Sequence, residues 1–386
     1  MIQPIVQTNS LKVKQFIKSQ FSQFHHAKQL DSLSDGVTGV LTSQSLQPSK
    51  IGNGLAEARG LLPKHAIKQV DRLLSNEQIN PHYCQTLLAK LLISNRKRIY
   101  VATDWTVFGK DEQMTLTIRL ITKHGRATPL LWKTVSSKTL KGNKTGYVFM
   151  LFEKLRRIVP QSTQVFVLGD REFGTLKNMN HLKATLGFDY ILRIKRNFTV
   201  TDSKKEIKKL AYEWLDLEKA TCIDNGFITV TDYAVNKIVI CKEPGMKDIW
   251  CIACSISDIA TETILACYGK RWGTECSYRD EKDLQFGFGL KKARIKNIER
   301  RDRLFLLSAI AIIFLTLIGA ACEAIGFDKY IKANTTKKRT HSLFTQGRLI
   351  LKLMPHLKQK WLEPVMNTTL ELLAGLDRIT DEQFFV

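Results

Sequence analysis

Alternation between apolar and polar residues predicts strands in the first half of the chain. Residues 114–120 place Met, Leu, Ile and Leu at every second position with Thr and Arg between them, as in a half-buried strand. Residues 99–103 and 165–168 are short apolar runs, and the second is typical of a buried parallel strand. Further strands are predicted near residues 130–135 and 190–194.

Helical patterns surround these strands. Residues 11–95 show no strand alternation and indicate helices, and residues 147–159 indicate an amphipathic helix that ends at Pro160. The order is three strands as hairpins, followed by helix, strand, helix and strand. That order is typical of a ribonuclease-H-like core, although other mixed α/β folds share it. We therefore expect an α/β protein with a ribonuclease-H-like core and a helical N-terminal domain.

A different pattern begins near residue 198. The segment is rich in lysine, and Asn225-Gly226 beside the alternating residues 227–230 predicts a hairpin turn. A strand at residues 250–255 and a long helix follow. The expected organisation is a helical N-terminal domain at 1–95, a ribonuclease-H-like core at 96–197 and 258–325, a β-rich insertion at 198–257, and a helical C-terminal region at 326–386.

One apolar segment allows two interpretations. Residues 304–322 contain no charged side chain, and as a helix they would be about 28 Å long, enough to span a bilayer. The segment is solitary in a polar chain, so it is equally consistent with a helix buried against a sheet. We favour the buried helix and expect no membrane partner.

The chain is strongly basic. Lys and Arg total 59 against 36 Asp and Glu, which gives a net charge of +23. The excess is spread along the sequence instead of forming one basic tail. A folded protein with this charge most often binds a polyanion, so double-stranded DNA is the expected partner and an anionic membrane surface is the competing one.

The cysteines do not indicate a metal site. Eight of them occur without regular spacing, which is typical of buried thiols in a reducing cytoplasm. Cys251 and Cys254 form a lone CxxC pair without the further ligands that zinc requires. We therefore expect a cytoplasmic protein.

A basic helix is predicted in the N-terminal region. Gly60-Leu61-Leu62-Pro63 separates two short helical patterns, and Lys64, Lys68 and Arg72 form a basic stripe on the second. This arrangement resembles a DNA-binding helix-turn-helix. An ordinary amphipathic surface helix would give the same pattern, so both interpretations remain open.

Two aspartates follow predicted core strands. Asp104 comes where the strand at 99–103 ends, and Asp170 where the strand at 165–168 ends. Because ligands bind outside the carboxyl ends of strands in open sheets, both carboxylates could meet at one site. Glu275 would add a third carboxylate from a helix across that edge, and three carboxylates can hold two Mg²⁺ ions. Each aspartate alone could also be an ordinary turn or capping residue.

Four side chains fall on one stripe of the long helix after the insertion. Tyr268, Arg271, Glu275 and Lys282 project within about 60° of one another if the helix is continuous. A carboxylate suits a hard divalent ion, and the cations beside it suit phosphate. The competing interpretation is a solvated helix face in which Arg271 and Glu275 form an ordinary i,i+4 pair.

These residues resemble a known family. The spacing Tyr268-x2-Arg271-x3-Glu275-x6-Lys282 is the YREK signature of DDE transposases of the insertion-sequence 4 family, with no position substituted. Asp104 and Asp170 look like the first two catalytic aspartates. Residues 66–76 and Ala333-Asn334-Thr335 are similar to flanking segments of that family, and the resemblance covers residues 50–350.

The resemblance implies a role for each site residue. Asp104, Asp170 and Glu275 would bind two Mg²⁺ ions, with Mn²⁺ as an alternative, and Tyr268, Arg271 and Lys282 would bind phosphates of the transposon end. Trp250 is placed like a family tryptophan that stacks on a flipped base, although burial in the sheet is the competing interpretation. The insertion at 198–257 would correspond to the family's β-rich insertion.

The expected protein is a bacterial cut-and-paste transposase that acts through a DNA hairpin. It would work as a homodimer on transposon ends and target DNA, in the cytoplasm with the nucleoid. Two alternatives remain open. The chain could be a non-catalytic DNA-binding regulator that keeps the fold, and the spare carboxylates of Glu172, Asp280, Glu281 and Asp283 could take part in metal binding.

Overall fold

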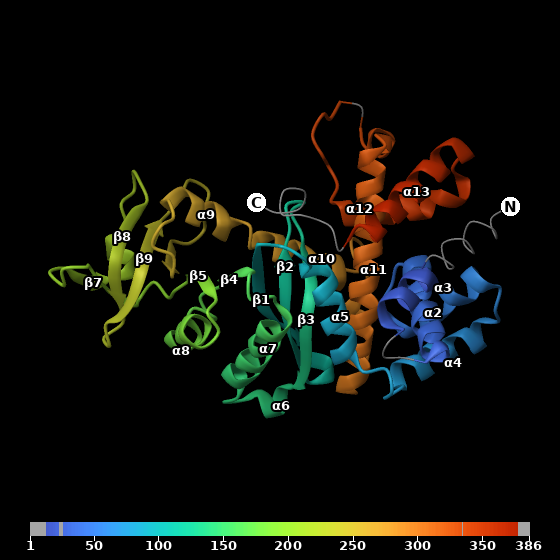
Figure 1. The fold of residues 1–386 in the computed structure, drawn as a ribbon, viewed down its shortest axis with the longest axis horizontal. Coiled ribbons are helices and arrows are strands. Elements are labelled where there is room, and N and C mark those ends of the chain that lie inside the picture. The colour runs from blue at the N-terminus through green and yellow to red at the C-terminus, as the bar shows by residue number, and fades with distance from the viewer. Residues whose placement is uncertain (1–12, 23–25, 334, 377–386) are drawn as a thin grey trace.

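The computed structural model describes residues 13–22, 26–333 and 335–376, so Asn334 of the family-like segment lies outside the described residues. The molecule is elongated (Figure 1). A cluster of N-terminal helices lies at one end, the core strands lie in the middle, and the strands of the insertion lie at the other end. Mixed α/β architecture is therefore confirmed.

The core strands have the predicted order. Strands β1 (Arg98–Phe108), β2 (Gln113–Ile121) and β3 (Ala127–Ser136) form an antiparallel meander, while β1, β4 (Gln164–Gly169) and β5 (Asp189–Arg193) are parallel. The apolar run of β4 is buried, as expected for a strand covered on both faces. This pairing brings the ends of β1 and β4 side by side.

The insertion extends the core sheet. Strand β10 (Trp250–Cys254) pairs with β5 and β9, so the sheet has ten strands in the order β3-β2-β1-β4-β5-β10-β9-β8-β6-β7. The remaining strands of the insertion are β6 (Thr199–Thr201), β7 (Lys208–Leu210), β8 (Thr221–Ile228) and β9 (Tyr233–Cys241).

The predicted hairpin turn at Asn225-Gly226 is wrong. Both residues lie inside β8, and the chain turns at residues 229–232, where Thr229 and Asp232 have positive φ. Asn225 has a positive φ of 51° and interrupts the regular pairing of β8 with β9. Gly226 is packed tightly, because a Cβ atom there would lie 2.9 Å from the side chain of Ile223.

Helices cover the core sheet. Helix α7 (Lys144–Ile158) begins three residues before the predicted helix and ends at the expected place, before Pro160. It is preceded by the short α6 (Ser137–Leu140), and α5 (Pro81–Ile93) lies nearby. Between β4 and β5 the chain forms α8 (Leu176–Asn180) and one π-helical turn (His181–Thr185).

The N-terminal cluster contains α2 (Ala27–Ser43), α3 (Pro48–Arg59) and α4 (Pro63–Ser75). The two short helices predicted around Gly60 are therefore present, and Gly60 ends α3 with a φ of +65°. Helix α4 buries Ala66, Val70, Leu73 and Leu74. Its predicted basic stripe of Lys64, Lys68 and Arg72 is exposed to solvent.

Helix α11 (Ile298–Ala324) runs through the protein between the core sheet and the N-terminal helices (Figure 1). It is the one described helix long and apolar enough to cross a membrane, yet 89% of its most apolar stretch is buried inside the protein. Its surroundings therefore agree with the interpretation of a core helix.

The C-terminal helices α12 (Leu343–Leu353) and α13 (Gln359–Ala374) pack on α11. Helices α11 and α12 approach closely at two glycines. A Cβ atom on Gly319 would lie 2.0 Å from the carbonyl oxygen of Leu343, and one on Gly347 would lie 1.9 Å from that of Leu315. Only glycine fits at these two contacts.

Candidate active site

The stripe of four predicted site residues lies on two helices. The expected single helix is wrong, because α9 (Thr261–Gly269) and α10 (Trp272–Lys282) are separated by a turn at Lys270 and Arg271. The N–H groups of Arg271, Gly273 and Thr274 bond to carbonyl oxygens three residues earlier, so the backbone is tighter than an α-helix there. Gly269 and Gly273 flank the turn, and glycine is a poor helix former.

Asp104 and Asp170 lie at the edge expected for them. The parallel pairing of β1 with β4 ends at Ala102 and Leu168, and each aspartate comes two residues later. The predicted end of the first strand was wrong, however, since β1 continues to Phe108 and pairs Asp104 with Thr117 of β2. Asp104 thus has a fixed extended backbone, whereas Asp170 begins the turn after β4.

The pKa of Asp104 reflects charges from the turn after β4 and from α10, so these segments meet near β1. Its pKa is raised from 3.8 to about 6, mainly by burial and also by the negative charges of Asp170 and Glu275, while Lys282 opposes the increase. The N–H of Trp105 also donates to Asp104 Oδ1 at 2.7 Å. Asp170, Glu275 and Lys282 therefore each lie within electrostatic reach of Asp104.

Arg271 interacts electrostatically with Tyr268 and with the carboxylates of Asp170 and Glu275. Its Nη1 atom lies 3.2 Å from Glu275 Oε1. Burial opposes the charge of the guanidinium, but Tyr268, Glu275 and Asp170 outweigh that effect and raise its pKa. The i,i+4 pair of the alternative interpretation is thus present, and it forms beside the carboxylate site.

Tyr268 and Trp250 pack against each other. Their rings meet edge to face, with centroids 4.8 Å apart. Only 3% of Tyr268 is exposed, and burial raises the pKa of its phenol. Trp250 is half-buried.

Sequence reasoning passed over Trp272, which is 68% exposed at the start of α10 and lies directly after Arg271.

Lys282 rests on Tyr278, another residue that sequence reasoning missed. The Lys282 Nζ atom lies 4.1 Å from the centre of the Tyr278 ring, and the guanidinium of Arg119 lies 4.2 Å from it. The Tyr278 hydroxyl bonds to Thr117 and lies 3.4 Å from the carbonyl oxygen of Asp104. Tyr278 therefore ties α10 to the strand that bears Asp104.

Three of the four spare carboxylates have structural partners. Glu281 forms a buried ion pair with Arg119, and Asp280 pairs with Arg126 at 2.7 Å. Asp283 accepts the N–H groups of the loop that follows α10. These side chains hold α10 in place, which leaves Glu172 as the remaining candidate beside the three predicted ligands.

A cavity of about 100 Å³ opens at the site. Asp104, Asp170 and Glu172 line it, together with residues of β1, α7 and α8. Glu275 does not line this cavity, and its side chain is 44% exposed.

The donor atoms suit a hard divalent ion in kind, because all are carboxylate oxygens. The like charges that raise the pKa of Asp104 would be relieved by a cation. However, across residues 13–22, 26–333 and 335–376, no three His, Cys, Asp or Glu side chains lie close enough together to hold one ion. Asp170 Oδ1 instead accepts the N–H groups of Glu172 and Phe173, and Glu275 faces Arg271.

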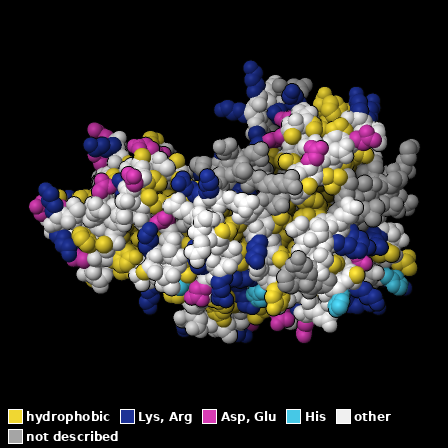
Figure 2. Space-filling model, in the orientation of Figure 1, with side chains coloured by type: hydrophobic (Ala, Val, Ile, Leu, Met, Phe, Trp, Pro, Cys, Tyr) yellow, Lys and Arg dark blue, Asp and Glu magenta, His cyan; other side chains and the backbone are white. Residues whose placement is uncertain are grey.

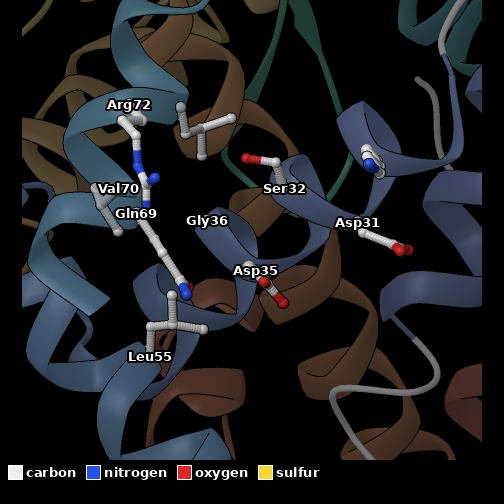
Figure 3. Close-up of a pocket in the computed structure, with 10 residues that line it drawn as sticks. Asp31, Ser32, Asp35, Gly36, Leu55, Gln69, Val70 and Arg72 are labelled. Carbon is white, nitrogen blue, oxygen red and sulfur yellow. The ribbon is translucent and has the colours of Figure 1, made fainter. Parts of the chain in front are cut away.

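The predicted DNA-binding residues of α4 lie on another part of the molecule. Arg72 lines a separate cavity of about 280 Å³, with Asp31, Ser32 and Asp35 of α2 and Gln69 of α4 (Figure 3). The space-filling view shows Lys and Arg side chains on all parts of the visible face (Figure 2). DNA contact by α4 stays a prediction.

Comparison with curated proteins finds no match. One family model does match, over residues 145–314. The matched segment contains Asp170, Glu275 and all of the YREK residues, and it begins after Asp104. The family is described as the transposase DDE domain, so residues 145–314 are similar to the domain of a catalytic transposase with a ribonuclease-H-like core.

Proposed function

We propose that this chain is a Mg²⁺-dependent DNA transposase of the insertion-sequence 4 family, which cuts transposon ends and joins them to target DNA. The observation that supports this most is the set of charges around Asp104. Asp170 and Glu275 oppose its ionisation and Lys282 favours it, although these residues lie 66 to 178 positions after Asp104 in the chain. Their spacing and identity match the family signature.

The catalytic carboxylates would be Asp104, Asp170 and Glu275. When bound there, two Mg²⁺ ions would activate the attacking oxygen and stabilise the leaving oxygen. Glu275 has to turn away from Arg271 to join the two aspartates. Because that pair is partly exposed, its loss costs little, on the order of 0–1 kcal/mol. Released from Glu275, the Arg271 guanidinium can bind a phosphate through two parallel hydrogen bonds.

The remaining residues would position DNA. Lys282 offers a point charge whose orientation the Tyr278 ring fixes. The phenol of Tyr268 stays neutral, so it supports Arg271 and can donate one hydrogen bond to a phosphate. Trp250 is half-buried, and stacking on a flipped base requires its exposed edge to become accessible. Trp272 already presents an exposed ring for stacking.

The family resemblance supplies the order of reactions. Water would nick DNA at the transposon end, and the new 3′ hydroxyl would attack the opposite strand to form a hairpin. A second water would open the hairpin, and the freed 3′ hydroxyl would attack target DNA. Each step is an in-line displacement at phosphorus, so one site can perform all four. Joining two ends requires a homodimer, with Lys64, Lys68 and Arg72 contributing to end binding.

A second candidate function is DNA binding without catalysis. It is favoured by the separation of the carboxylates, no three of which lie close enough to hold an ion among the described residues. It differs from the leading proposal in one respect, because a regulator would bind transposon ends without ever nicking them.

Substitution of the carboxylates tests the proposal. Asp104→Asn and Glu275→Gln should abolish Mg²⁺-dependent cleavage of DNA that carries the ends flanking the reading frame, a loss of at least about a thousandfold, while end binding persists. Glu206→Gln, at an exposed carboxylate of the insertion, is the matched control and should retain wild-type cleavage. Cleavage by Asp104→Asn at the wild-type rate would remove that residue from the mechanism, and a wild-type protein that binds ends without nicking them would favour the regulator.

A further inference from the structure

The cavity that contains Asp104 and Asp170 has another wall, formed by the start of α7. Lys144 and Thr145 are the first two residues of this 15-residue helix, and both line the cavity. Neither residue belongs to the YREK signature or to the predicted carboxylates. The proposed reaction therefore leaves this wall without a role.

The start of α7 has the properties of an anion site. Its N-cap residue, Asn143, makes no side-chain capping bond. The first N–H groups of a helix have no partner within the helix, and the helix dipole favours negative charge there. Gly142 turns the chain with a φ of +82°, and a Cβ atom on Gly146 would meet nothing within 4 Å. The first turn is thus open to a ligand, and the Lys144 side chain is exposed beside it.

Two buried polar atoms in the same cavity point independently to a ligand. Thr103 and Asn178 are 6% and 7% exposed, and both line the cavity. Within the part of the chain that the structure describes, Thr103 Oγ1 and Asn178 Oδ1 have no hydrogen-bond partner. The amide nitrogen of Asn178 donates to the carbonyl of Phe173 at 2.7 Å, which fixes the orientation of Oδ1. Buried polar atoms without partners are costly and rare in folded proteins.

We propose that the start of α7 binds a backbone phosphate of the DNA strand that enters the carboxylate site, next to the phosphate that reacts. Lys144, the Thr145 hydroxyl and the free N–H groups of α7 donate to it. The Thr103 hydroxyl donates toward the same ligand, and Asn178 Oδ1 accepts from a water held with it. This inference rests on the proposed function, because it assumes that a DNA strand lies in the cavity. The positive charge of Lys144 also offsets repulsion between that phosphate and the nearby carboxylates.

Protection of Lys144 from acylation tests the anion site without any DNA cleavage. The full-length protein is treated with an amine-acylating reagent in inorganic phosphate or in chloride at the same ionic strength, and each lysine is quantified by mass spectrometry. Phosphate should slow acylation of Lys144 by about fivefold, as expected for one charge-assisted contact. Lys141, which is exposed three residues earlier, should react equally in both. Equal reaction of Lys144 in both solutions would overturn the proposal.

The salt dependence of DNA binding tests the DNA assignment. Lys144→Ala should lower the slope of log affinity against log salt by about 0.9 for DNA carrying the transposon ends. Lys144→Arg should restore the slope, Lys141→Ala should leave it unchanged, and equal melting temperatures show that the variants fold. If the slope is unchanged in Lys144→Ala while the wild type still cleaves the ends, the phosphate subsite is contradicted and the proposed transposase function is not. Wild-type protein that neither binds nor cleaves ends, yet shows phosphate protection of Lys144, contradicts the proposed function and leaves an anion site.

Discussion

The surroundings of Asp104 disfavour the ionised form of its carboxyl group. Burial and the charges of Asp170 and Glu275 raise its pKa to about 6. Near neutral pH the carboxylate is nevertheless ionised, so the folded protein keeps an unfavourable charge at the place where the proposed function needs a ligand. Strain of this kind at a functional site is offset by stability elsewhere in the fold.

Removing this charge should stabilise the protein at neutral pH. The pKa of Asp104 is about 6 in the folded protein and 3.8 ordinarily. The loss of stability caused by its ionisation is therefore absent below pH 3.8, develops as the pH rises from 3.8 to 6, and is complete above that pH. Asp104→Asn should therefore increase the free energy of unfolding at pH 7 by about 1–3 kcal/mol. The increase should vanish near pH 3.5.

Denaturant unfolding at the two pH values measures this difference. Glu172→Gln is the control, because Glu172 is exposed and its substitution should change stability by less than about 0.5 kcal/mol. If Asp104→Asn were less stable than the wild type at pH 7, the described environment of Asp104 would be incorrect.

At the scale of elements, local patterns predicted the strands and missed what depends on distant partners. The apolar run of β4 reflects burial on both faces, and that requirement is visible in the sequence. The alternation at residues 114–120 predicted strand β2 but not its full burial, because Thr117 and Arg119 are covered by Tyr278 and Glu281 of α10. The break between α9 and α10 was missed, although Gly269 and Gly273 flank it, because the spacing of the four site residues is helical across the turn. The hairpin turn predicted at Asn225-Gly226 was wrong because both residues lie within β8 and the turn comes at residues 229–232.

The same reasoning separates the predictable and unpredictable parts of the site. The position of Asp170 followed from the end of β4, whereas Asp104 lies within β1, two residues after its parallel pairing with β4 ends. The choice among the nearby carboxylates could not be predicted. Glu281 is excluded as a ligand by its ion pair with Arg119, which lies 162 residues away in the chain. No spacing rule relates two such residues, so only the fold identifies the partner.

The contact between α11 and α12 gives a prediction at this scale. Gly347→Ala would place a Cβ atom 1.9 Å from the carbonyl oxygen of Leu315, so the helices must move apart. We expect a loss of at least about 1–3 kcal/mol in the free energy of unfolding. Gly146→Ala is the matched control, because a Cβ atom there meets nothing within 4 Å. Equal stability of the two variants would show that the helices are not packed this closely.

At the scale of the molecule, α11 joins the N-terminal helices to the core sheet. Arg303 donates to the carbonyl oxygen of Leu74 in the last turn of α4 and to that of Ile79 in the loop that follows. The preceding Asp302 accepts the N–H of Thr134 in β3 at 3.0 Å. Consecutive residues thus hold the basic helix α4 and the core sheet in a fixed relation.

The net positive charge is distributed unevenly between the insertion and the rest of the protein. Residues 198–257 contain eight Lys, no Arg and nine Asp or Glu, so the insertion is nearly neutral although it is rich in lysine. The net charge of +23 therefore resides in the rest of the chain. We infer that the core and the helical regions contribute most of the electrostatic attraction to DNA.

Salt dependence of DNA binding checks this distribution. Lys64→Ala, Lys68→Ala and Arg72→Ala should each reduce the slope of log affinity against log salt by about 0.9, because each neutralises one phosphate. Lys219→Ala, on an exposed part of the insertion, should leave the slope unchanged. If all four substitutions lowered the slope equally, α4 would contribute no more to DNA binding than the insertion does.

The central claim is that Asp104, Asp170 and Glu275 bind a pair of divalent ions together. Paramagnetic resonance of Mn²⁺ added to the full-length protein on transposon-end DNA tests it most directly. We predict two spin-coupled Mn²⁺ ions in each wild-type site, and loss of the coupled signal in both Asp104→Asn and Glu275→Gln. A wild-type complex without the coupled pair, or the same pair in Glu275→Gln, would contradict the claim.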